Sequence, residues 1–144
     1  MRKASLGEYV TGKLQTIAGA ATHQVFTVTG GEVLITAMWG VTATAMAGAN
    51  TVNVQTDPTT GDTVVIASAT DLGTTDTAAG TVIAGQAATA AVPALVKGSG
   101  TPLCFVATTG EVESVITGAG ADGAIQWYCT YVALTDGATV TASA

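Results

Sequence analysis

The sequence predicts an all-β protein, either a β-sandwich or a jelly-roll-like antiparallel barrel of about ten short strands. Short runs rich in Val, Ile, Thr and aromatic residues recur along the chain, and Gly, Asp and Thr residues separate them. No run of helical length carries apolar residues at helical spacing. No motif recurs at a fixed period, which argues against a solenoid or a propeller.

The clearest strand covers residues 124–135, AIQWYCTYVALT. Its two faces carry different side chains: Trp127, Cys129, Tyr131 and Ala133 on one, and Gln126, Tyr128, Thr130, Val132 and Leu134 on the other. Neither face is purely apolar, as expected inside a sandwich or against a neighbouring subunit. Trp127 and Tyr131, together with Trp39, are therefore candidate core or interface anchors, with the core favoured for Trp127.

The chain before this strand divides into two predicted parts. Residues 1–22 form an N-terminal arm or extended segment, and residues 23–144 form a single β-sandwich domain. The arm carries its few apolar side chains over residues 9–17, which favours a short strand or an extended conformation. Gly19-Ala20-Ala21 has the composition of a flexible joint.

Turn residues separate the predicted strands of the sandwich. Gly30-Gly31 lies between two β-rich runs and predicts a hairpin, and Gly40 predicts a bulge or bend. Residues 57–62 (DPTTGD) predict a turn, and residues 69–73 a single helical turn. Pro93 predicts an edge strand. The strands expected are residues 24–29, 32–44, 49–57, 63–68, 80–85, 90–96, 102–107, 112–117, 124–135 and 138–142.

Composition indicates a protein that contacts other proteins. Hydrophobic residues make up 48% of the chain but aromatic residues only 5%, so the core is built mostly of Ala and Val. Charged residues make up 10%, against roughly 25% in ordinary soluble domains. A thin core and a weakly charged surface together favour a homo-oligomer.

Charge is distributed unevenly along the chain. Arg2, Lys3 and Lys13 against Glu8 give residues 1–13 a charge of +2, and Lys97 against nine acids gives the remainder −8. An acidic body argues against DNA or RNA as a partner, because phosphate binding requires a basic surface. The basic start is either a docking element or a frayed, solvated terminus.

Neither secretion nor membrane insertion is indicated. Polar and glycine residues interrupt any apolar stretch that follows Arg2 and Lys3, and no window of about 20 residues is apolar enough to span a bilayer. Cys104 and Cys129 are expected as buried free thiols, because nothing indicates an oxidising compartment.

No residue pattern predicts catalysis, a cofactor or a metal. His23 is the only histidine, and the sequence contains no nucleophile motif with which it could form a hydrolase triad. The sequence Gly118–Gly123 matches G-x-G-x-x-G but precedes a strand, so it is expected to be a turn. The remaining acidic pairs are expected to be solvated: Asp57 and Asp62 at a turn, and Glu111 and Glu113 on one strand face.

The order of several short motifs resembles a family of small virion structural proteins of tailed bacteriophages, which includes head decoration or cement proteins. These motifs are residues 25–31 with 33–36, residues 53–61, Asp71-Leu72, and residues 127–138, so the likeness covers about residues 24–142. Where the family favours Pro after the Tyr-Val pair, this chain has Ala133.

The resemblance implies a non-enzymatic protein without cofactors that binds the outer surface of the phage head and stabilises the shell. Its partner would be the major capsid protein, its state a homotrimer, and its location the capsid surface after synthesis in the host cytoplasm, with no nucleic-acid or membrane partner. Arg2, Lys3 and Lys13 would then be capsid-docking residues that steer an arm to an acidic patch. The alternatives are a tail-tube, head-fibre or connector protein, or a carbohydrate-binding adhesion module.

Overall fold

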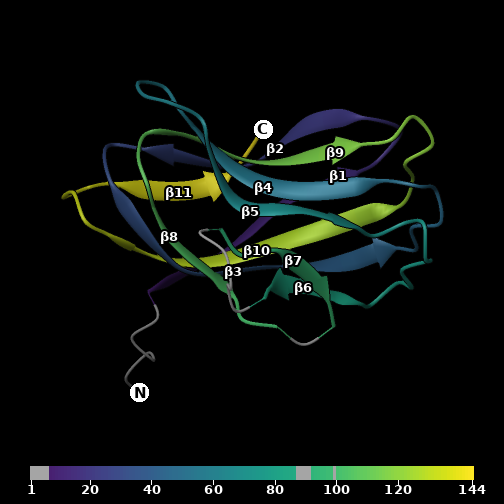
Figure 1. The fold of residues 1–144 in the computed structure, drawn as a ribbon. Helices are drawn as coiled ribbons and strands as arrows, with labels where there is room; N and C mark the ends of the chain where they lie inside the picture. The colour runs from purple at the N-terminus through teal and green to yellow at the C-terminus, as the bar shows by residue number, and fades with distance from the viewer. Residues whose placement is uncertain (1–6, 87–91, 99) are drawn as a thin grey trace, which may run out of the picture.

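The computed structural model describes residues 7–86, 92–98 and 100–144. Two antiparallel sheets pack face to face as a β-sandwich, which confirms the predicted fold class (Figure 1). No helix occurs in these ranges. The strands are β1 (Glu8–Thr16), β2 (Ala21–Thr29), β3 (Val33–Thr44), β4 (Thr51–Pro58), β5 (Val64–Asp71), β6 (Val82–Gly85), β7 (Leu95–Lys97), β8 (Leu103–Ala107), β9 (Gly110–Thr117), β10 (Ala124–Ala133) and β11 (Thr139–Ala142).

Strands that follow one another in sequence mostly lie in opposite sheets. Sheet A has the order β1-β10-β3-β6-β7, with β8 also paired to β3. Sheet B has the order β11-β2-β9-β4-β5. In Figure 1, β4, β9 and β11 form the upper layer, and β3, β6 and β10 the lower one. β10 and β9 are therefore interior strands of their sheets although they come late in the chain.

The predicted hairpin at Gly30-Gly31 is wrong. β2 pairs with β9 and β11 in sheet B, whereas β3 pairs with β10 in sheet A. The φ angles of Gly30 and Gly31 are 80° and 130°, and the turn they form carries the chain from one layer to the other. Both strands direct their apolar side chains into one core, so they face each other across it instead of pairing edge to edge.

The second predicted turn does join a hairpin. β4 and β5 pair directly, and the hydroxyl of Thr63 donates to Asp57 Oδ1 over 2.7 Å across the connecting loop. The helical turn expected after it is absent, because β5 continues through Asp71. The backbone amides of Gly73 and Thr74 then donate to Asp71 Oδ1 at 2.9 and 2.8 Å, which makes an Asx turn.

The described part of the predicted N-terminal arm is a strand of the sandwich. β1 pairs along its length with β10, from Glu8 opposite Tyr131 to Thr16 opposite Ala124. Gly19, expected in a flexible joint, has a φ of 95° in the connection to β2, and its amide donates to the carbonyl of Ala121 at 2.8 Å. The sequence predicts an extended conformation for this segment, but it does not predict that the segment forms a strand of sheet A.

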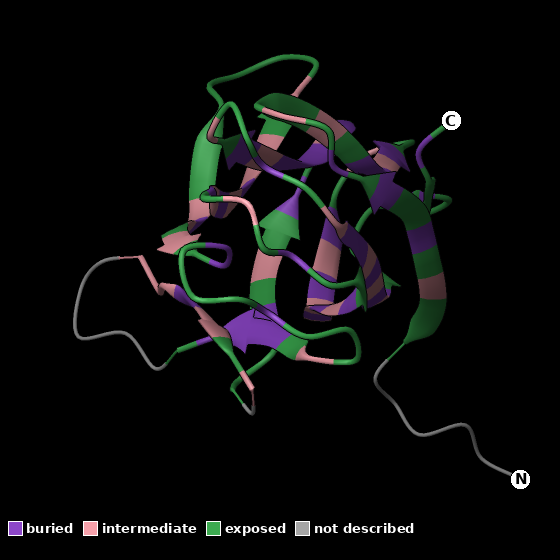
Figure 2. Ribbon diagram, turned by 90° about the vertical axis from the view of Figure 1, so that its right-hand side faces the viewer, coloured by how far each residue is buried: buried purple, intermediate pink, exposed green. Residues whose placement is uncertain are grey.

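Trp127 lies at the centre of the core. It is fully buried on β10, and its indole Nε1 donates to Gln15 Oε1 at 2.8 Å. Gln15 Nε2 in turn donates to Ser114 Oγ at 3.3 Å, so a buried polar chain joins sheet A to sheet B. Figure 2 shows the alternation of buried with half-buried or exposed residues along the strands that this inward packing produces.

Gly40 makes room for Trp127 and does not form the expected bulge. The register between β3 and β10 stays regular at Gly40, which lies opposite Trp127. A Cβ at Gly40 would come within 3.0 Å of the Trp127 ring and of Ile125. A glycine inside a strand can mark either a bulge or a close approach of neighbouring groups, and here it marks the close approach of Trp127.

Candidate interaction surface

The outer face of sheet B is polar and its side chains bond to one another. The hydroxyls of Thr27 and Ser143 donate to Glu111 Oε2 at 2.9 and 3.0 Å. Gln55 Nε2 donates to Glu113 Oε2 at 2.8 Å. Glu111 and Glu113 thus have hydrogen-bond partners on neighbouring strands, and they do not form a paired-carboxylate site.

The outer face of sheet A is different in kind, because the side chains that strand pairing directs outward on β1, β3, β6, β8 and β10 are aromatic, aliphatic, hydroxyl, thiol or amide. The charged residues of these strands are Glu8, which lies opposite the inward residue Tyr131, and Lys13, which lies at the irregularity in the pairing of β1 with β10; both are exposed. The outward residues are Tyr9, Thr11, Leu14, Leu34, Thr36, Trp39, Val41, Val82, Cys104, Val106, Gln126, Tyr128, Thr130 and Val132.

Three aromatic side chains from three adjacent strands meet on this face and form what we name the aromatic cluster: Tyr9, Trp39 and Tyr128. Their ring centroids are 5.7 Å apart for Trp39 and Tyr128, 6.1 Å for Tyr9 and Tyr128, and 6.5 Å for Tyr9 and Trp39. Tyr9 is 59% exposed and the other two are half-buried. Trp39 is therefore a surface residue, whereas Trp127 and Tyr131 lie in the core.

An aliphatic patch occupies one end of the same face, defined by Leu34, Val106, Val132 and Leu134. Leu34 lies opposite both Val132 and Val106 in the paired strands. Val106 is 54% exposed, Leu134 52% and Val132 39%. Gly7, where the described chain begins, packs beside Val132, since a Cβ there would approach Val132 Cγ2 to 2.9 Å. The N-terminal segment therefore joins the sandwich at this patch.

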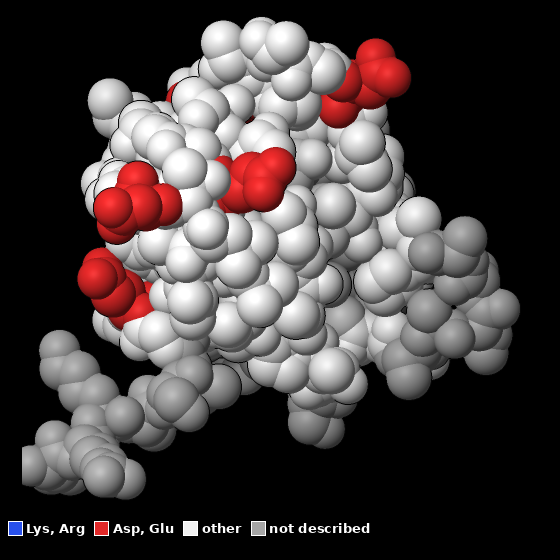
Figure 3. Space-filling model, turned by 90° about the vertical axis from the view of Figure 1, so that its left-hand side faces the viewer, with Lys and Arg blue, Asp and Glu red and all other residues white. Residues whose placement is uncertain are grey.

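This end of the sandwich carries six of the ten carboxylates. Glu32, Asp57, Asp62 and Asp136 lie in or next to its turns, and Glu8 and Glu111 lie near strand starts there. Figure 3 views the sandwich from this end and shows acidic side chains, and no lysine or arginine among the described residues in view. The body is thus acidic at the end where the chain enters.

The three predicted docking residues do not form one described group. Arg2 and Lys3 lie outside the described residues. Lys13 is on β1, where its Nζ donates to the carbonyl oxygen of Ala144 at 2.7 Å. Lys13 thus ties the C-terminus to the body of the sandwich and lies apart from the aliphatic patch.

The motifs that suggested chemistry have structural roles. The loop at Gly118–Gly123 leads into β10, as expected for a turn, and Asp122 Oδ1 accepts hydrogen bonds from the amides of Ala47 and Gly48 at 2.9 and 2.7 Å. These amides, Gly48 first, hold the pKa of Asp122 below its usual range. No group of three or more potential metal ligands occurs within residues 7–86, 92–98 and 100–144. No helix there is long and apolar enough to cross a membrane.

Stability should fall between pH 7 and pH 5 because of His23. Desolvation, and then the nearby charge of Lys13, lowers the pKa of His23 below its value of about 6.5 in an unfolded chain. The unfolded state therefore binds the proton first, so this contribution is full above about pH 6.5 and is lost as the pH falls. Urea unfolding at pH 7.5 and 5.5 should show a smaller pH difference for His23→Gln than for the wild type. Equal differences would contradict this assignment.

The two cysteines are free but differ in exposure, so the expectation that both are buried is wrong for Cys104. Cys104 is exposed on β8, whereas Cys129 is buried on β10, and β3 separates the two strands. Burial raises the pKa of the Cys129 thiol to about 12. Cys129 is therefore protonated and shielded at neutral pH.

Thiol titration should distinguish these two residues. In the native protein without reductant, a thiol reagent such as Ellman's reagent should modify Cys104 alone. Both thiols should react after denaturation, because the chain contains two cysteines and both are free. The variant Cys104→Ser should abolish the native reaction. Rapid native modification of Cys129 in that variant would show that the core opens at β10.

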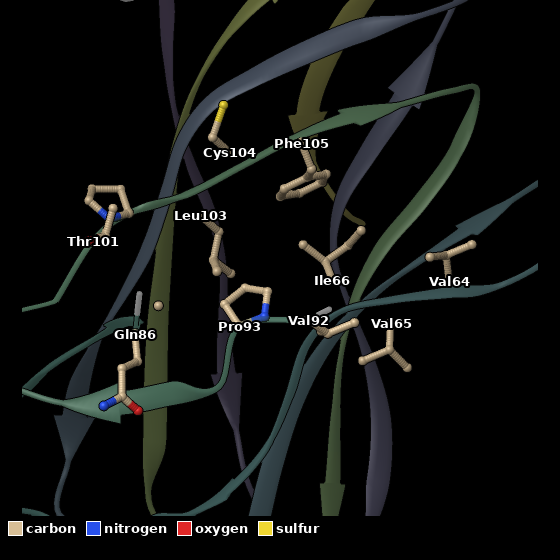
Figure 4. Close-up of a pocket in the computed structure, with 12 residues that line it drawn as sticks. Val64, Val65, Ile66, Gln86, Val92, Pro93, Thr101, Leu103, Cys104 and Phe105 are labelled. Carbon is tan, nitrogen blue, oxygen red and sulfur yellow. The ribbon is translucent and has the colours of Figure 1, made fainter. Parts of the chain in front are cut away.

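An apolar pocket lies at the open side of the sandwich, between β5 and β8. Its volume is about 480 Å³. Figure 4 shows Ile66, Pro93, Leu103 and Phe105 around it. The pocket carries no titratable pair or convergent polar group among its described lining residues, so it offers no catalytic arrangement.

Comparison of this chain with known proteins identifies no relative. The chain matches no protein-family model, and neither a curated protein nor a solved structure matches it.

Proposed function

We propose that this protein decorates the head of a tailed bacteriophage by binding the outer surface of its capsid and stabilising the shell. The observation that carries the proposal is the exposed aliphatic patch at the point where the N-terminal segment joins the sandwich. The sequence resemblance to phage virion proteins supports the choice of the major capsid protein as the partner. The role is structural and involves no reaction.

The patch has the properties of a protein contact. Single exposed aliphatic side chains are ordinary, but Val106 and Val132 flank Leu34 on paired strands, and Leu134 follows Val132 by two residues. Burying them in a complex would remove apolar area from water, which favours association. The sequence before Gly7 contains Arg2 and Lys3, and we propose that their positive charge favours an acidic capsid surface.

Binding to undecorated capsids tests this proposal. Purified heads of the phage that encodes the protein, assembled without it, should retain the wild-type protein in sedimentation. Val106→Ser with Val132→Ser should bind much more weakly. Val64→Ser is a matched control, because Val64 is also an exposed valine, 51% accessible, on the edge of sheet B. Equal binding of the patch variant would place docking elsewhere, and no binding of the wild type would overturn the proposal.

In this proposal, the protein assembles as a homotrimer. The low charge and the Ala- and Val-rich core favour subunits that bury part of their surface against one another. Sedimentation velocity of the isolated protein should show a species larger than a monomer at high micromolar concentration. A monomer under those conditions would confine self-association to the capsid surface.

A further inference from the structure

The aromatic cluster has the geometry of a platform. The three centroid distances are nearly equal, so no ring lies between the other two. The ring planes are close to parallel for two pairs, at 18° and 22°, and tilted by 36° for Tyr9 and Trp39. Tyr9 and Trp39 are therefore each stacked with an offset against Tyr128, and the partly overlapping rings together present an aromatic surface on an open sheet.

The sheet holds this surface in place. β1, β10 and β3 are adjacent hydrogen-bonded strands, and Tyr128 lies opposite Thr11 on one side and Trp39 on the other. Thr36 and Thr130 bond through their hydroxyls at 2.7 Å in the neighbouring row. A site built on paired strands is more rigid than one built on loops, so little conformational freedom is lost when a ligand binds.

We propose that the aromatic cluster binds a neutral polysaccharide chain, with pyranose rings lying on Tyr9, Trp39 and Tyr128. The C–H bonds on one face of a pyranose ring are slightly positive and meet the negative face of an aromatic ring. The sugar hydroxyls point outward from the ring, where the hydroxyl oxygens of Thr11 and Thr130 and the amide oxygen of Gln126 can accept hydrogen bonds. Gln126 Nε2 donates to the carbonyl of Gly12 and the Thr130 hydroxyl bonds to Thr36, so these groups act toward a sugar as acceptors. An open surface of this kind fits a chain, because it does not enclose a single sugar.

Charge argues against nucleic acids and anionic polysaccharides, two other classes of ligand that stack on aromatic rings. Nucleic-acid bases stack equally well, but their phosphates require cationic side chains nearby. The two described lysines are engaged away from this face: Lys13 with the Ala144 carbonyl and Lys97 with the Thr75 carbonyl. The net charge of −6 also repels anionic polysaccharides. A neutral chain is therefore the class of ligand that fits.

This site is separate from the aliphatic patch and does not depend on the proposed decoration. Tyr128 and Val132 belong to the same strand, four residues apart, which corresponds to roughly 13 Å along β10, and Trp39 lies opposite Tyr128. Tyr9 lies nearer the patch, because it is opposite Thr130, two residues from Val132. Trp39→Ala can therefore leave the patch intact, and binding to capsids and binding to sugars can be measured independently.

Affinity electrophoresis in native gels tests the inference, with hydroxyethylcellulose, glycogen or galactomannan in the gel and alginate as the anionic control. At least one neutral polymer should retard the full-length protein, and alginate should not. Tyr9→Ala and Trp39→Ala should each weaken this binding by about tenfold or more. Val106→Ser should bind as the wild type does. Trp39 should dominate any change in tryptophan fluorescence on binding, because Trp127 is buried.

Three results would overturn the inference. The first is unchanged wild-type mobility in all of the neutral polymers. The second is full retardation of Tyr9→Ala with an unaltered melting midpoint, which shows that the variant is folded. Tyr9 suits this test because it is largely exposed. The third is loss of capsid binding in Tyr9→Ala without any effect of polysaccharides, which would assign the cluster to the docking surface.

Discussion

Trp127→Ala should lower the free energy of unfolding by about 3–5 kcal/mol, the usual cost of removing a fully buried large aromatic side chain. The ring packs over Gly40 on the neighbouring strand, so its removal leaves a cavity that the small glycine cannot fill. The substitution also leaves Gln15 Oε1 without the indole N–H that donates to it. An unsatisfied buried acceptor adds about 1–3 kcal/mol to such a loss.

Two further variants separate these effects. Trp39→Ala removes the same side chain from the outer face of sheet A, where it is half-buried, and should cost much less. Trp127→Phe keeps an aromatic ring but loses the hydrogen bond to Gln15, and should lie between the two. Urea unfolding monitored by circular dichroism gives all three values. A urea midpoint of Trp127→Ala equal to that of the wild type would show that Trp127 does not stabilise the core.

Deletion of residues 1–13 should abolish cooperative folding, whereas deletion of residues 1–6 should leave the sandwich intact. β1 runs from Glu8 to Thr16 and covers the edge of β10, so the longer deletion removes most of one strand of sheet A. Val10, which packs against the core, is lost with it. The exposed edge of β10 would then present unpaired backbone groups that favour aggregation.

Thermal unfolding and size-exclusion chromatography of the two truncated proteins measure this difference. A cooperative transition near the wild-type midpoint for the longer deletion would show that β1 is dispensable. The shorter deletion also isolates the basic residues Arg2 and Lys3 from the strand. Undiminished capsid binding by a folded protein lacking residues 1–6 would remove the basic segment from the docking proposal.

The alternation of side chains predicted much of this fold. It placed Trp127, Cys129 and Tyr131 on one face of a strand and Tyr128 on the other, as β10 has them. Pro93 predicted an edge strand, and β7, which follows it, ends sheet A. These features depend on local backbone chemistry, which a single stretch of sequence contains.

Strand order could not be predicted in the same way. Two β-rich runs joined by two glycines predict a hairpin, yet β2 and β3 lie in different sheets because each finds partners far along the chain. The aromatic cluster shares this origin. Tyr9, Trp39 and Tyr128 are distant in sequence, and only the pairing of β1 and β3 with β10 brings them together. The alternation of side chains within each of these strands does not reveal which other strands lie beside it.

The position of β9 and β10 has a consequence for the order of folding events. β10 separates β1 from β3, and β9 separates β2 from β4, so these two pairs of early strands are joined into their sheets only through residues 110–133. Pairing across such long stretches of chain is slow, because loop closure costs entropy before any contact is made. Residues 110–133 must therefore be synthesised before either sheet can be completed. The rate of folding should depend on the last third of the sequence, and truncation there should leave the first two thirds unfolded.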